Sequence, residues 1–198
     1  MRKPWLLLAV GVILCQNPVL CGPTPDKAAY SNVLDVLNAL WQYERSGRPH
    51  GSRRIAFELP VQAINSYLSI ALKLKPRPGI ESLNLAFFPH NRIVAEARID
   101  FTQVRLRPSK ALSQEVLGQL KGSQVIKAEF RFRIKRGKLT FKVLPVPSDG
   151  VKLPKRALED VIRAVAAMQP EKIDTSRPIP VPFGLTLATG DRMLTGHT

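Results

Sequence analysis

Apolar residues recur at three- and four-residue spacing in four segments, which places them on one face of a helix. These segments run from residue 26 or 27 to about 45, from 61 to 74, from 109 to 121 and from 154 to about 170. Pro60 and Pro154 open the second and fourth segments, and Pro76 stops the second. Ser109 is the expected N-cap of the third segment. The pattern therefore predicts four helices.

Other segments alternate between apolar and polar residues, as half-buried strands do. They lie at 55–59, 83–87, 93–101, 130–134, 139–143, 183–187 and 192–195. The turns Arg136-Gly137 and Gly190-Asp191 predict hairpins. The apolar phase switches at Val104, which predicts a bulge or bend there. Helices interspersed with hairpins predict an α+β fold in which an antiparallel sheet packs on helices.

The first residues form a short positive segment followed by an apolar run of about ten residues from Leu6, as in a secretory signal peptide. Val19 and Cys21 suit cleavage after Cys21, although the same run could serve as an uncleaved anchor. A lipoprotein signal is disfavoured because leucine precedes both cysteines. We expect a signal peptide at 1–21, a helix and linker at 22–53, a single α+β domain at 54–198, and export to the periplasm or envelope.

The composition is that of a globular, strongly basic protein. The 198 residues are 44% hydrophobic and 23% charged, with a formal net charge of +15. Such a charge indicates an anionic partner or surface without distinguishing nucleic acid, anionic lipid and acidic polymer. Cleavage after Cys21 would leave no cysteine, which excludes disulfides, thiol catalysis and thiolate metal sites from the mature chain.

The residues that usually carry catalysis are scattered. His50, His90 and His197 fall in a predicted loop, a turn and the tail, without metal-ligand spacing. The chain also lacks a nucleophile elbow and a glycine-rich phosphate loop. We therefore predict a non-enzymatic protein without cofactor or metal. A hydrolase whose histidine is assembled by folding is kept as a third hypothesis.

Cations and phenylalanines alternate along the predicted hairpin at residues 127–143. They consequently occupy opposite faces, whereas single-stranded nucleic acid needs cations beside exposed aromatic rings. We therefore expect no nucleic-acid partner. Two interpretations stay open: an ordinary solvated sheet face, or a basic rim that meets anionic lipid head groups. In the second, the membrane-docking residues are Arg133, Lys135, Arg136 and Lys138.

Ala95 and Ala97 are small residues on the predicted inward face of the sheet. They would either let a helix pack closely or leave an apolar cleft for an acyl chain, and periodicity cannot separate a filled core from a cavity.

Three parts of the chain together carry a resemblance. They are residues 57–68 followed by 78–83, the strand 93–101, and residues 145–147 with the last helix and residues 180–185. They resemble a group of exported bacterial proteins that share an Asn-x-Tyr-Leu helix, here from Asn65, and a C-terminal Pro-Phe-Gly-Leu motif, here from Pro182. That group is similar to the TULIP-like lipid-binding proteins of bacterial envelopes, such as YceB-like lipoproteins. The resemblance covers roughly residues 54–194.

The resemblance implies a curved antiparallel sheet wrapped on a long helix, with an apolar ligand in the groove between them. It also implies structural roles for Asn65 at the sheet edge and for Pro182 and Gly184 in a turn. The function expected is the binding of a lipid or other apolar molecule at the cell envelope. The alternative is a ligand-free envelope protein that binds a protein or an anionic polymer through its basic face. The predicted ligand contacts are Leu68, Leu72, Phe87, Ile99, Phe101, Phe130, Phe132 and Phe141.

Overall fold

The computed structural model describes residues 27–46, 55–146, 153–171, 174–181 and 185–198. The predicted signal peptide, Pro182 and Gly184 lie outside these ranges. The described chain is an α+β structure with two antiparallel sheets. None of the helices within these ranges is both long enough and apolar enough to cross a bilayer.

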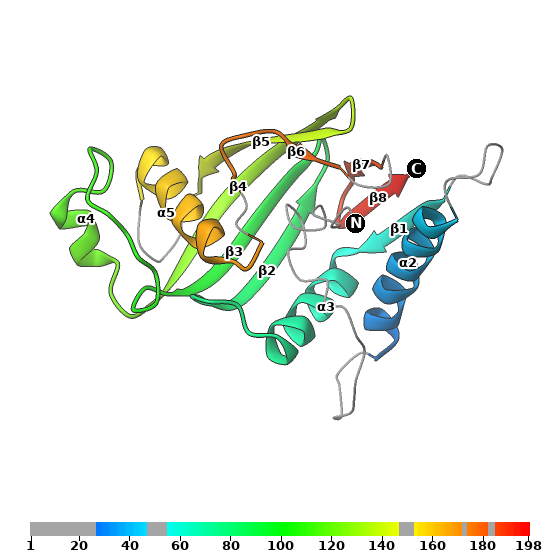
Figure 1. Cartoon of the computed structure of the whole chain (residues 1–198), viewed down its shortest axis with the longest axis horizontal. Coiled ribbons are helices and arrows are strands. Elements are labelled where there is room, and N and C mark those ends of the chain that lie inside the picture. The colour runs from blue at the N-terminus through cyan, green and yellow to red at the C-terminus, as the bar shows by residue number, and fades with distance from the viewer. Residues whose placement is uncertain (1–26, 47–54, 147–152, 172–173, 182–184) are drawn as a thin grey trace.

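The larger sheet has five strands and curls into a half-barrel (Figure 1). Its strands follow the order β2-β3-β4-β5-β6. Their bounds are Ile80–Phe88, Arg92–Asp100, Ser123–Lys135, Lys138–Pro145 and Ile179–Pro180. Phe132 pairs with Phe141 across β4 and β5, while Arg131 pairs with Lys142. The predicted separation of phenylalanines and cations onto opposite faces is therefore confirmed.

The smaller sheet has three strands in the order β1-β8-β7, and Figure 1 shows it beside helices α2 and α3. β1 spans Ala56–Pro60, β7 spans Thr186–Thr189 and β8 spans Met193–His197. The two helices span Lys27–Arg45 and Val61–Leu74, close to the predicted bounds. They pack together, and the rings of Tyr30 and Tyr67 stack with 5.5 Å between their centroids.

The Asn65 side chain links α3 to the edge strand β2. Its Nδ2 donates to the Leu85 carbonyl at 2.9 Å, and its Oδ1 accepts from the Leu85 amide at 2.8 Å. The side-chain amide thereby occupies the place of a neighbouring strand's peptide group. The structural role expected for Asn65 is confirmed.

Helix α5 spans Lys155–Met168, as predicted, and packs against β5. The prediction of a helix over 109–121 was wrong, because α4 spans only Gln114–Gln119. The Ser109 hydroxyl instead accepts from the amides of Ala111 and Leu112 in a turn. Ser113 is the cap, and its hydroxyl accepts from the Val116 amide at 3.3 Å. Both serines are suitable caps, and the apolar spacing alone does not choose between them.

Two further expectations need correction. The C-terminal strands were predicted at 183–187 and 192–195, but β7 and β8 are shifted toward the C-terminus, and the short strand β6 was not predicted. In place of one long helix inside a curved sheet, two helices of 14 residues each, α3 and α5, pack on the larger sheet. The phase switch at Val104 is confirmed as an irregular segment, because β3 ends at Asp100.

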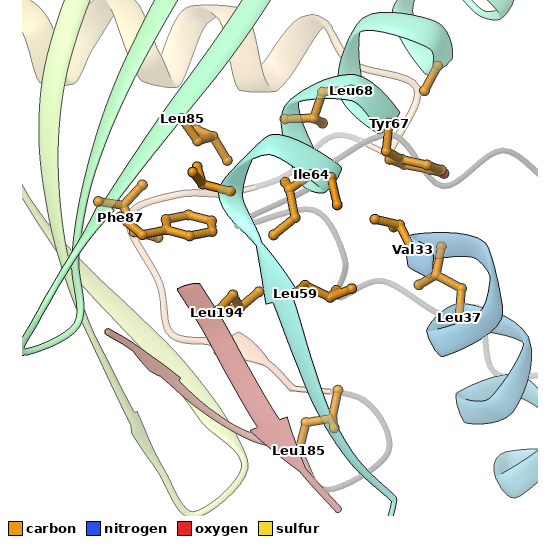
Figure 2. Packing of buried hydrophobic residues seen from close by; sticks show 14 of the residues in the cluster. Val33, Leu37, Leu59, Ile64, Tyr67, Leu68, Leu85, Phe87, Leu185 and Leu194 are labelled. Atoms are coloured by element: carbon orange, nitrogen blue, oxygen red, sulfur yellow. The ribbon is translucent and has the colours of Figure 1, made fainter. Parts of the chain in front are cut away.

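The buried apolar residues form two clusters. The first joins α2, α3, β1, β2 and β8, and Figure 2 shows Leu59, Leu68, Phe87 and Leu194 within it. The second joins α5 to the far half of the larger sheet through residues such as Ile126, Leu158 and Val161. Ile80, Phe130 and Phe141 are half-buried and pack against both clusters, so they mark the boundary between them.

Candidate ligand-binding site

A pocket of about 280 Å³ lies between β5, α5 and the segment 174–176. β6 pairs with only Lys138 and Leu139, so beyond Leu139 no described strand covers the outer edge of β5. The pocket is lined along this edge by residues of three separate segments. They are Phe141, Lys142, Val143, Glu159, Ile162, Arg163, Thr175 and Ser176.

The apolar part of the pocket comes from β5 and α5. Phe141 and Val143 lie on the same face of β5, and Ile162 projects from α5 beside the buried face of that helix. Phe141 also meets Phe130 edge to face, with 5.9 Å between the ring centroids. Phe141 therefore belongs both to the pocket and to the boundary between the two core clusters.

The polar rim of the pocket carries Lys142, Arg163 and Glu159. Arg163 donates to Asp160 at 2.9 Å, and Glu159 lies 3.6 Å from Lys155 in an i,i+4 ion pair. Among the described residues, Lys142 has no acidic partner. Within the described ranges, Lys142 is therefore the cation of the rim that forms no ion pair, and Glu159 places one carboxylate at the same rim.

The segment on the open side of the pocket is shaped by Asp174. The Ser176 hydroxyl and the Ser176 amide both donate to Asp174 Oδ1. The hydrogen bond from the Ser176 hydroxyl, followed by that from the amide, lowers the pKa of the Asp174 carboxyl. Asp174 also pairs with Arg177 at 3.2 Å. These bonds hold a tight turn that places Thr175 and Ser176 at the pocket.

The structure buries six of the eight predicted ligand contacts in the core and leaves two half-buried. Leu68, Leu72, Phe87 and Phe132 are buried in the first cluster, whereas Ile99 and Phe101 are buried in the second. Phe130 and Phe141 are half-buried and touch one another, and Phe141 lines the pocket. The structure thus brings two of the eight together at an accessible surface.

The small residues of the inward face also lie near the boundary between the clusters. Ala95 is half-buried against the first cluster and Ala97 is half-buried against the second. Ala95 pairs with Leu85 on one side and with Ala128 on the other. Small side chains on adjacent strands therefore accompany the half-buried phenylalanines on this face of the sheet.

Sequence reasoning missed most of the pocket. Ile162 was recognised only as part of an apolar helix face, while Thr175 and Ser176 fall in a proline-rich segment that matches no binding motif. Their contribution depends on the packing of α5 and residues 174–176 against the open edge of β5, which local spacing does not reveal.

The remaining predicted site residues that the structure describes are exposed. Arg133, Lys135, Arg136 and Lys138 all lie exposed at the end of the β4–β5 hairpin. His90 and His197 are also exposed, and His50 lies outside the described residues. Within the described ranges, no three His, Cys, Asp or Glu side chains gather in a way that could hold a metal ion.

Comparison of the sequence with models of protein families and with curated proteins finds no match.

Proposed function

We propose that this protein binds a lipid or another amphipathic molecule at the bacterial cell envelope, without catalysing a reaction on it. The observation that carries the proposal is the pocket at the edge of β5, where Phe141, Val143 and Ile162 form an apolar wall. Lys142, which forms no ion pair with the residues that the structure describes, lies beside this wall. An apolar wall with a cation at its rim suits an acyl chain attached to an anionic head group.

The size of the pocket limits what it can hold. Its 280 Å³ lies just below the range of about 300–1,000 Å³ that is usual for small-molecule sites. It therefore suits a short acyl chain, or part of a longer one that continues over Phe130 toward the boundary of the clusters. Each CH₂ group withdrawn from water contributes about 0.8 kcal/mol, so each further carbon that the pocket buries should tighten binding about fourfold.

The overall fold and the sequence support the proposal less specifically than the pocket does. A curled antiparallel sheet with helices packed on it is compatible with a TULIP-like relationship. The resemblance of residues 54–194 to exported bacterial proteins, and the leader-like first 21 residues, favour the envelope as the place of action.

Native mass spectrometry of protein purified from its own envelope, with organic extraction of the same sample, tests whether a cargo exists. We expect a discrete additional mass that extracts as lipid. A bare polypeptide mass that stays unchanged after incubation with envelope lipids would reject the proposal and favour a ligand-free interaction protein.

A pocket-filling substitution tests the site. We expect Ile162→Trp to weaken the binding of a fluorescent fatty-acid analogue at least tenfold, because the indole ring would occupy the apolar wall. Leu74→Trp is the matched control, since Leu74 is 57% exposed at the end of α3, and it should bind like the unmodified protein. Equal binding by Ile162→Trp and the unmodified protein would exclude this pocket as the site.

A further inference from the structure

We infer that the end of the β4–β5 hairpin is a docking surface for an anionic lipid bilayer, separate from the proposed ligand pocket. This surface, the basic tip, consists of Arg133, Lys135, Arg136 and Lys138. All four side chains are exposed. Among the described residues, none of the four has an acidic partner.

Away from the tip, carboxylates pair with several cations of the same sheet face. Lys127 lies 2.8 Å from Glu96, and Glu129 lies 2.8 Å from Arg131 and 3.8 Å from Arg92. Three cations in the middle of this face thus have acidic partners. Among the described residues, Lys142 and Arg98 of the same face do not, and at the tip all four cations lack one, so unpaired positive charge is concentrated at the tip. This contrast argues against an evenly solvated face and indicates a localised site for negative charge.

The tip retains its charge at a cost to the fold. Lys135 and Lys138 are directly opposite one another across the turn, and like charges in that relation destabilise a hairpin. Arg136 has a φ of 52°, in the left-handed region that Asn, Asp and Gly adopt more readily. Residues that violate local preferences in this way are typical of functional surfaces.

The tip is also firmly held. On the opposite face of β4 and β5, Phe132 and Leu139 are buried in the first cluster. Leu139 pairs with Ile179 of β6, and the Val181 amide donates to the Gly137 carbonyl at 2.7 Å. The cations are thus presented by a braced turn, so little conformational entropy is lost when they meet a partner.

A bilayer fits this surface better than other anionic partners. Within the described part of β4 and β5, the phenylalanines point to the face opposite the cations. Phe88 of β2 lies on the cationic face, but Arg92 covers its ring at 4.4 Å from the centroid, so the tip offers no open ring of its own strands on which bases could stack. A stable protein interface buries about 800 Å² on each partner, which a two-residue turn does not offer. A membrane surface requires no shape complementarity and attracts each nearby Lys or Arg independently.

Charge reversal at Lys135 provides a sharp test, because binding and stability should change in opposite directions. Lys135→Glu replaces a repulsive cross-strand pair with an attractive one, so its melting temperature should rise. Its affinity for vesicles of phosphatidylglycerol and phosphatidylcholine should fall roughly 25-fold, at about fivefold for each unit of charge. Weaker binding then cannot be attributed to unfolding.

Arg107→Glu is the matched control. Arg107 is exposed in the segment that follows β3, and β3 ends where Asp100 pairs with Ser123, at the end of β4 away from the hairpin turn. The substitution changes the net charge equally. Vesicle co-sedimentation should show near-normal binding for Arg107→Glu. Equal losses for Lys135→Glu and Arg107→Glu would overturn the inference in favour of unspecific attraction. Tighter, Lys135-dependent binding to soluble polyphosphate than to vesicles would overturn it in favour of an anionic polymer.

Discussion

Asn65 closes part of an edge that would otherwise be open to pairing with another chain. β2 is the first strand of the larger sheet, and its outer edge faces α3. An amide side chain offers one donor and one acceptor, which match the carbonyl and the amide of Leu85. Aspartate would accept but not donate, and leucine would do neither. The residue type therefore follows from the geometry of the strand edge.

Replacing Asn65 should destabilise the protein without altering its charge. Asn65→Ala removes both hydrogen bonds to a part-buried backbone and should lower the free energy of unfolding by about 1–3 kcal/mol. Urea denaturation followed by circular dichroism measures the change. Asn84→Ala is the control, because Asn84 is exposed on β2, the strand that Asn65 contacts. Its free energy of unfolding should stay within about 0.5 kcal/mol of that of the unmodified protein. Equal effects at the two positions would contradict the assigned role.

The smaller sheet depends on a glycine in its middle strand. Gly196 of β8 pairs with Phe57 of β1 and with Leu187 of β7. A Cβ at this position would lie 2.8 Å from Cδ2 of Leu187, and closer still to the Phe57 ring. The absence of a side chain therefore lets Phe57 and Leu187 meet over the backbone of β8.

Two glycine-to-alanine substitutions should consequently act in opposite directions. Gly196→Ala forces Phe57 and Leu187 to move and should cost about 1–3 kcal/mol, as overpacking usually does. Gly118→Ala in α4 meets nothing within 4 Å and should stabilise by about 0.5–1 kcal/mol through the higher helix propensity of alanine. Thermal unfolding measures both changes. A stabilised Gly196→Ala variant would show that the sheet tolerates a side chain there.

The spacing of apolar residues predicted the helices and the hairpin whose residues are neighbours in the sequence. Apolar spacing located α2, α3 and α5, and alternation located the β4–β5 hairpin with its turn at Arg136-Gly137. The division into two sheets was not predicted, because β1 pairs with a strand more than a hundred residues further along the chain. The pocket was missed for the same reason: Ile162, Ser176 and the edge of β5 become neighbours only in the folded chain.

The two core clusters are joined at one end by an ion pair whose arginine is buried. Arg77 follows α3 and has only 2% of its side chain exposed, while Glu171 follows α5. Nη1 of Arg77 donates to both carboxylate oxygens, at 2.9 and 2.8 Å. Close by, Nε2 of Gln169 donates to the Pro78 carbonyl at 3.2 Å. The C-terminal ends of α3 and α5 are thereby tied together.

Breaking this tie should weaken the whole structure. Glu171→Ala leaves a buried guanidinium without its carboxylate and should lower the free energy of unfolding by about 3 kcal/mol. Arg77→Met combined with Glu171→Leu should recover most of that loss, because no buried charge remains. Glu159→Ala breaks an exposed pair with Lys155 and should cost less than about 1 kcal/mol. Chemical denaturation of the three variants and the unmodified protein measures these changes. Similar losses of unfolding free energy for Glu171→Ala and Glu159→Ala would contradict the role assigned to the Arg77–Glu171 pair.

The pairing of β1 with β8 also determines which parts of the chain can fold first during synthesis. Residue 56 meets residue 197, and β8 is the strand that joins β1 to β7. A growing chain can form the hairpins of the larger sheet early, because their strands are adjacent in sequence. It cannot complete the first cluster until Leu194 has been translated, so the N-terminal helices have no finished surface to pack against until then. The first cluster, unlike the hairpins of the larger sheet, is therefore completed only after β8 has left the ribosome.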